Sequence, residues 1–158
     1  MDDITIARVI HILAIIFWIG GVAMVTTVLL PAVRQFKSPD EQLAFFDKVE
    51  RRFANQSRLS TLLAGLSGLY MVWKLDAWNR FADASFWWMD AMVLVWLIFT
   101  LMLFVAEPLF LHRWLEARAK AAPEATFRLV ARLHWTLLML SIVTVIGAAA
   151  GAHGLFFF

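Results

Sequence analysis

The stretch that decides the fold runs from residue 6 to residue 33 and reads IARVIHILAIIFWIGGVAMVTTVLLPAV. After Arg8 it contains no residue with a fixed charge. About 20 apolar residues in a helix cross the roughly 30 Å hydrocarbon layer of a bilayer. The stretch is therefore predicted to span a membrane. The acidic start Met-Asp-Asp and the length of the apolar run favour a retained anchor over a cleaved signal peptide.

The composition indicates the same class of protein. Hydrophobic residues make up 62% of the chain, charged residues 16%, and the mean hydropathy is +0.75. A soluble domain is closer to half apolar and a quarter charged. Cysteine is absent, which excludes disulfides, iron–sulfur clusters and covalently attached c-type haem. The basic residues lie in loops beside apolar segments, so we interpret them as a topology signal and expect no nucleic-acid partner.

Four apolar segments, at about residues 4–33, 59–75, 86–111 and 129–155, predict an all-α fold. We expect one domain over residues 1–158, an integral membrane four-helix bundle. An amphipathic helix starting near Ser38 or Asp40 precedes the second segment and can run directly into it. In the second segment, Ser60, Ala64 and Gly68 form a stripe of small residues that favours close packing between membrane helices.

The distribution of lysine and arginine predicts the orientation. The first loop and the third loop hold most of them: Arg34, Lys37, Lys48, Arg51, Arg52 and Arg58 in the first, and Arg113, Arg118, Lys120, Arg128 and Arg132 in the third. The middle loop holds only Lys74 and Arg80. The positive-inside rule then places both termini outside. We expect a multi-pass protein of the bacterial inner (cytoplasmic) membrane, in contact with the lipid bilayer.

The four histidines are the candidate metal ligands, and they form two pairs of matching depth. His11 and His153 lie near the outer ends of the first and fourth segments, whereas His112 and His134 lie near the inner ends of the third and fourth. Two imidazoles on facing helices hold a b-type haem in many bundles. The pairs predict one haem, and a second if both pairs bind, with Arg113, Arg128 and Arg132 as partners for the propionates.

Each of these residues also has a structural interpretation. A histidine inside a membrane helix is costly and needs a partner, and a hydrogen bond to a neighbouring helix would satisfy His11. His153 can be an interfacial residue and His112 a loop-edge residue. The glycines at 20, 21, 147 and 151 suit either a flat macrocycle or simple helix packing. Glu107, before Pro108, is a candidate partner for Arg51 or Arg52.

The pattern His11-x6-Trp18-x2-Gly21, followed by Glu50-Arg51-Arg52 and a glycine-rich second segment, resembles the HemJ-type protoporphyrinogen oxidases and the related CopD-like membrane proteins. The resemblance covers the first half of the chain and, in layout only, the second half. It implies haem contact at His11, with Trp18 and Gly21 beside it, and a porphyrinogen as substrate. CopD-like proteins imply copper handling instead.

Three functional hypotheses follow. The first is a haem b electron-transfer protein or oxidoreductase that exchanges electrons with a quinone or another carrier, and the second is an oxidase acting on a porphyrinogen. The third is a copper-transport or copper-resistance protein without haem, in which the methionines act as soft ligands: Met24, Met71, Met89 and Met92. Filling gaps in the core is the alternative role of these methionines, and packing is the alternative role of Trp18. A homo-oligomer or a subunit of a membrane complex is the expected assembly.

Overall fold

The computed structural model describes residues 2–35 and 38–155. Within these ranges it describes all side chains except those of Pro39, Asp40, Leu43, Ala44, Phe46, Asp47, Glu50, Arg51, His112 and Glu116. The described part is helical and has no strand, which confirms the all-α class. Three of its segments are long and apolar enough to cross a membrane, namely Asp3–Val33, Ala84–Leu111 and Pro123–Ala152. The expectation of a membrane protein is therefore supported.

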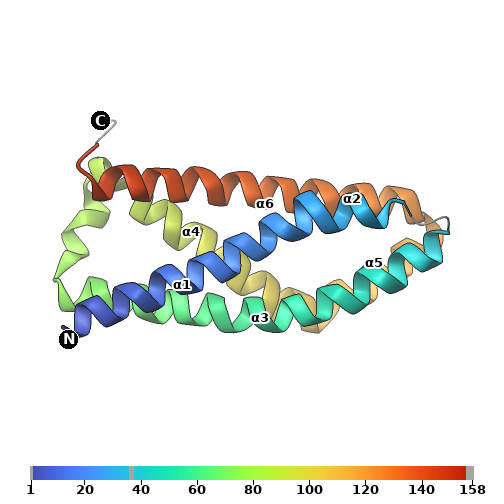
Figure 1. The fold of residues 1–158 in the computed structure, drawn as a ribbon, viewed down its shortest axis with the longest axis horizontal. Helices are drawn as coiled ribbons and strands as arrows, with labels where there is room; N and C mark the ends of the chain where they lie inside the picture. The colour runs from blue at the N-terminus through green and yellow to red at the C-terminus, as the bar shows by residue number, and fades with distance from the viewer. Residues whose placement is uncertain (1, 36–37, 156–158) are drawn as a thin grey trace.

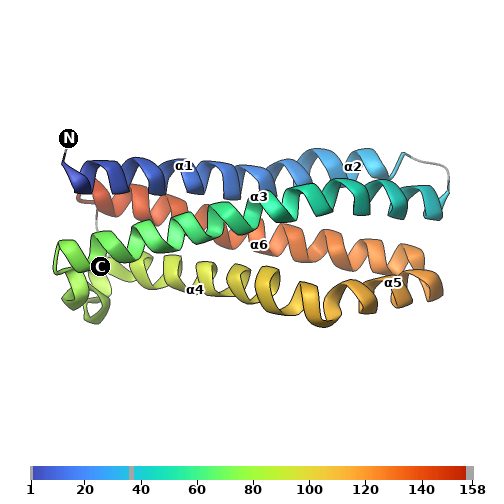
Figure 2. The same cartoon turned by 90° about the horizontal axis from the view of Figure 1, so that it is seen from below.

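The molecule is elongated, and its long helices run along the same axis (Figures 1 and 2). The elements in chain order are α1 (Asp3–Met24), η1 (Val25–Leu29), α2 (Leu30–Val33), α3 (Pro39–Lys74), η2 (Ala77–Ala82), η3 (Ala84–Phe86), α4 (Trp87–Leu101), η4 (Met102–Leu111), α5 (His112–Ala121) and α6 (Pro123–Ala152). Helix α1 begins and α6 ends at the same end of the molecule (Figure 1). This end is called the terminal end below, and the opposite end, which carries α2 and α5, is called the basic end.

Helix α3 joins two segments that the sequence separates by hydropathy. It runs for 36 residues, so the amphipathic stretch and the second apolar segment form one continuous helix. Its start is fixed by Ser38, whose hydroxyl accepts a hydrogen bond from the Glu41 amide, with Pro39 in the first turn. Ser38, one of the two residues predicted to begin this helix, is thus the N-terminal cap. Helix α3 is not among the three described segments that are apolar enough by themselves to span a membrane.

The first helix packs against α3 along most of their shared length (Figure 2). The buried residues of α3 in the described part of the chain are all small: Ala54, Ser57, Ser60, Thr61, Ala64 and Ser67. Small side chains let two helix backbones approach closely, and the hydroxyls can bond to carbonyls of their own helix. The predicted small-residue stripe therefore lies at a real helix interface.

Both prolines that lie within apolar segments are associated with π-helical turns. Pro31 follows η1 directly, and Pro108 lies inside η4. Proline lacks the amide hydrogen that an α-helix needs at that position and crowds the preceding turn, so a wider turn relieves the conflict. The third apolar segment is consequently an α-helix to Leu101 and a π-helix from Met102, rather than one uniform helix.

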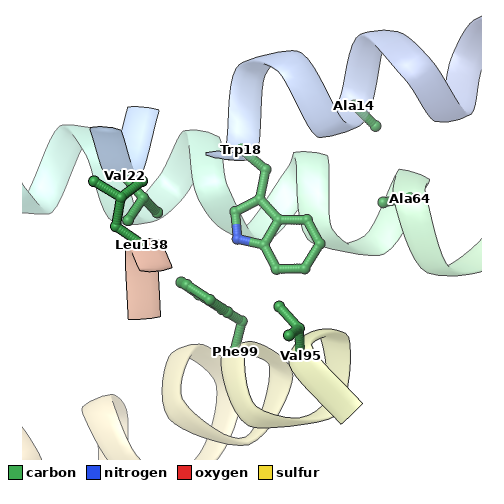
Figure 3. Close-up of a cluster of buried hydrophobic side chains, with 7 residues drawn as sticks. All are labelled: Ala14, Trp18, Val22, Ala64, Val95, Phe99 and Leu138. Atoms are coloured by element: carbon green, nitrogen blue, oxygen red, sulfur yellow. The ribbon is translucent and has the colours of Figure 1, made fainter. Parts of the chain in front are cut away.

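The centre of the molecule is an apolar cluster around Trp18, and Figure 3 shows the side chains that form it. The members come from α1, α3, α4 and α6: Ala14, Trp18, Val22, Ala64, Val95, Phe99 and Leu138. The rings of Trp18 and Phe99 meet edge to face, with centroids 5.0 Å apart. Trp18 is only 4% exposed, so the alternative packing role predicted for it is confirmed. Many large apolar side chains point outward instead, as expected for a surface that contacts lipid.

Candidate functional site

His11 lies at the interface between α1 and α3, near the terminal end. Its Nδ1 is 2.9 Å from the carbonyl oxygen of Ala64 and 3.1 Å from the hydroxyl oxygen of Ser67. Both partners belong to the buried small-residue face of α3. The partner that a membrane histidine requires is therefore a backbone carbonyl on the neighbouring helix.

This contact determines which ring nitrogen of His11 carries the proton. A carbonyl oxygen can only accept a hydrogen bond, so Nδ1 donates and, in the neutral ring, Nε2 carries the free lone pair. Nε2 makes no hydrogen bond with any side chain or backbone group that the structure describes. Histidines that bind metals are commonly held in this way, with one ring nitrogen donating to a carbonyl and the other facing the metal. His11 is thus oriented as a neutral imidazole with one available nitrogen.

Gly68 provides the space for the His11 ring. A Cβ atom added to Gly68 would lie 3.2 Å from Cε1 of His11, which is tighter than ordinary packing. Gly20 of α1 differs, because a Cβ atom added to it would meet no atom within 4 Å. Of these two glycines, only Gly68 is required by the histidine.

A cavity of about 360 Å³ lies in the groove between α1 and α3, and His11 itself is not part of its wall. Ser67, which contacts His11, is part of its wall, together with Ala7 and Ile10 of α1. Cavities that bind small molecules are usually between about 300 and 1,000 Å³ and mostly apolar. Toward the terminal end, the cavity reaches Asp3 and Tyr70, whose hydroxyl donates to the Asp3 carboxylate at 2.8 Å.

An ion pair closes the terminal end of this groove. The ammonium group of Lys74 lies 3.0 Å from the same Asp3 carboxylate. Asp3 begins α1 and Lys74 ends α3, so the pair ties the two helix ends together. Both side chains are close to half exposed, and an ion pair in such a position contributes little stability by itself.

The other described histidines bond to their own helix. In His134 the Nδ1 atom lies 2.9 Å from the Val130 carbonyl, and in His153 it lies 2.8 Å from the Ala149 carbonyl. His134 is half-buried, whereas His153 is exposed at the end of α6. No described hydrogen bond joins His11 to His153. The proposed pairing of His112 with His134 involves a side chain that lies outside the described residues.

The glycines of α6 are covered by aromatic rings. A Cβ added to Gly147 would clash with Trp87, and one added to Gly151 would clash with Trp88, both from the start of α4. On α1, Gly21 is likewise covered by the ring of Phe53. These glycines thus accommodate indole and phenyl rings of neighbouring helices. Of the two predicted roles, helix packing is therefore the one found at these three positions.

The partner of Glu107 differs from the predicted one. The Arg58 guanidinium donates to the Glu107 carboxylate at 2.9 Å and to the Leu103 carbonyl at 3.1 Å. Arg51 and Arg52 were the predicted candidates, and the side chain of Arg51 lies outside the described residues. The π-helical η4 places Leu103 and Glu107 opposite Arg58, and the wider turn at Pro108 was not predicted from the sequence.

A second cavity, of about 640 Å³, lies between α2 and the first half of α6 at the basic end. Its wall includes Arg34, Arg128 and Arg132, and it includes none of the described histidines. Arg128 and Arg132 were predicted to bind haem propionates together with Arg113. The structure places Arg34, not Arg113, beside them. No group of three or more histidine, aspartate and glutamate side chains gathers among the described residues.

The fold and the site together define an all-helical membrane protein with one oriented imidazole between two tightly packed helices. Comparison with known proteins adds no family to this description: no family model matches the chain, and neither a curated protein nor a solved structure matches it. The function is therefore argued from the site.

Proposed function

We propose that this chain is an integral membrane protein that binds haem b through His11 and transfers electrons. The observation that carries the proposal is the His11 ring, whose Nδ1 is engaged by the Ala64 carbonyl and whose Nε2 is left available. A neutral imidazole with this orientation is the usual protein ligand of a b-type haem iron. When bound, haem supplies a one-electron carrier inside the membrane.

The residues around His11 fit this role in part. The ring orientation suits a cofactor held by one nitrogen, and the adjoining groove has a mostly apolar cavity of about 360 Å³, which His11 reaches only through its contact with Ser67. The chain would hold the ring through Ala64 and Ser67 and would exclude water with Ile6, Ile10 and other apolar side chains of the wall. His153, at the same end of the molecule, would be the second residue to hold this haem. His112 and His134 remain the candidates for a second haem at the basic end.

The space that Gly68 leaves for His11 gives a direct test. Gly68→Val should press on the imidazole, because even a Cβ atom at this position lies 3.2 Å from Cε1. Disturbing a group that orients a metal ligand typically weakens metal binding about 10- to 100-fold. We expect the haem content of purified protein to fall accordingly. Gly20→Val is the matched control, because nothing lies within 4 Å of the added Cβ, and it should retain its haem. Equal haem content in the two variants would contradict the role of His11.

We also propose that four helices span the membrane, with α3 as the fourth member and both termini outside. The basic residues near Arg34 and Arg128 mark the inner end, and the opposite end carries both termini. A bundle in which α3 packs along α1 places the polar face of α3 away from lipid. Reporter fusions within residues 76–85 and after α6 should therefore give an external signal, and a cytoplasmic signal from either position would refute this topology.

Copper handling is the alternative that the same purification tests. If metal analysis finds copper and the protein shows no haem spectrum, copper would replace haem as the proposed cofactor. The reaction partner of a haem protein of this kind would be a quinone or a porphyrinogen, both of which are apolar enough to reach the groove between α1 and α3 from the bilayer. Turnover with either compound would establish an enzyme rather than a simple carrier.

A further inference from the structure

The cavity at the basic end has features of a binding site that the haem proposal does not use. Its wall includes Leu30 and Pro31 of α2 and Trp135 of α6. Leu30 is buried in the cluster that joins α2 to Phe127 of α6. The two helices that line the cavity are therefore held together by core packing.

Three guanidinium groups surround this cavity, and no acidic residue lines it. Arg34 ends α2 and stacks on the Phe127 ring, 5.4 Å from its centroid. Arg128 forms an exposed ion pair with Glu124, at 3.4 Å, on its own helix. Arg132 makes no hydrogen bond or ion pair with any residue that the structure describes. The cavity thus has an excess of positive charge that is at most partly compensated by the protein.

In this cavity the arginines lie next to an apolar surface, as expected at the membrane depth of the lipid head groups. Arg128 and Arg132 are one turn apart on α6, and Trp135 follows on the same face toward the centre of the helix. Tryptophan favours the interface between head groups and acyl chains. Arginine binds phosphate oxygens through paired, charge-assisted hydrogen bonds. Along α6, two phosphate-binding arginines therefore come first and an apolar wall follows. This order matches a phospholipid that lies parallel to the helix.

We propose that this cavity binds the head group of one anionic phospholipid of the inner leaflet. Basic cavities between membrane helices on this side are suited to anionic head groups, and the apolar walls distinguish a lipid from a free anion. The lipid would lie between α2 and α6 and link the end of the first membrane segment to the last. This inference does not depend on haem, because no described histidine lines the cavity.

Binding of phosphatidylglycerol to the purified full chain tests the proposal, by native mass spectrometry in detergent and by the shift in melting temperature. Arg132→Gln and Arg34→Gln should each weaken binding about fivefold, the effect expected for one basic residue near an anionic membrane surface. Arg113→Gln is the control, because it removes the same charge at the same end of the molecule from an exposed position outside the cavity. Phosphatidylcholine should bind weakly to all of them.

Three outcomes would overturn the proposal. Equal losses in Arg132→Gln and Arg113→Gln would mean that general surface charge attracts the lipid. Equal binding of phosphatidylcholine would mean that the arginines do not select the head group. Displacement of the lipid by millimolar inorganic phosphate, with the same melting shift, would assign the cavity to a free anion. A cooperative melting transition in each variant shows that the arginine substitutions leave the protein folded.

Discussion

His11→Ala is expected to abolish haem binding at the terminal end of the molecule. The substitution removes the only ring nitrogen that the α1–α3 interface leaves available, and alanine offers no ligand atom. Loss of a metal ligand reduces occupancy by at least the factor of about 10 to 100 that is seen when only its orienting partner is lost. The Soret band of protein purified from membranes should be absent, or strongly reduced and shifted to a high-spin form.

His153→Ala and His134→Ala serve as comparisons for this variant. Both histidines also bond to a carbonyl through Nδ1, but on their own helix. If His153 is the second axial ligand, its variant should retain haem and become high-spin. His134→Ala should keep the outer haem and lose only a second haem, if one is present. An unchanged spectrum in His11→Ala, with intact folding, would exclude His11 as a ligand.

Trp18→Ala is expected to produce the largest loss of stability of any single substitution considered. The indole fills the centre of the cluster where α1, α3, α4 and α6 meet (Figure 3), and its ring stacks edge to face on Phe99. Truncating a buried tryptophan to alanine typically costs about 3–5 kcal/mol, through lost contacts and the cavity left behind. Reversible unfolding in mixed detergent micelles measures this change.

Two variants make the Trp18 result specific. Trp18→Phe keeps an aromatic ring and removes an indole N–H that has no hydrogen-bond partner in the described part of the chain, so it should retain most of the stability. Trp73→Ala removes an indole that is 63% exposed, and its cost should stay within about 0.5 kcal/mol. A Trp18→Ala loss as small as that of Trp73→Ala would show that the cluster does not hold the helices together.

The helical class and the main helix positions could be predicted from the sequence because apolar length is a strong local signal. The first segment was expected at residues 4–33 and is found at Asp3–Val33, and the small-residue stripe of α3 was correctly placed at an interface. The start of the last helix at Pro123 follows the sequence signal of a proline and an acidic residue in a first turn, whereas α5 (His112–Ala121) occupies a stretch that was expected to be a loop.

The contacts of individual side chains could not be predicted, because they depend on helix rotation and pairing. Spacing along the chain identified His11 as a residue that needs a partner, but not that the partner is the Ala64 carbonyl. The pairing of Arg58 with Glu107 depends on the π-helical turns of η4, which alter the facing residues by a fraction of a turn. The sequence left two roles open for the glycines of α6, a macrocycle or helix packing, since adjacency of two helices does not reveal that the rings of Trp87 and Trp88 fill the gap.

The haem content of the unmodified protein, purified from membranes and assayed by pyridine haemochrome, tests the central claim most directly. We predict a reducible b-type spectrum with at least one haem per chain, held at the terminal end by His11. Protein that is folded, contains no haem after expression with a haem supply and takes up none on titration would contradict it.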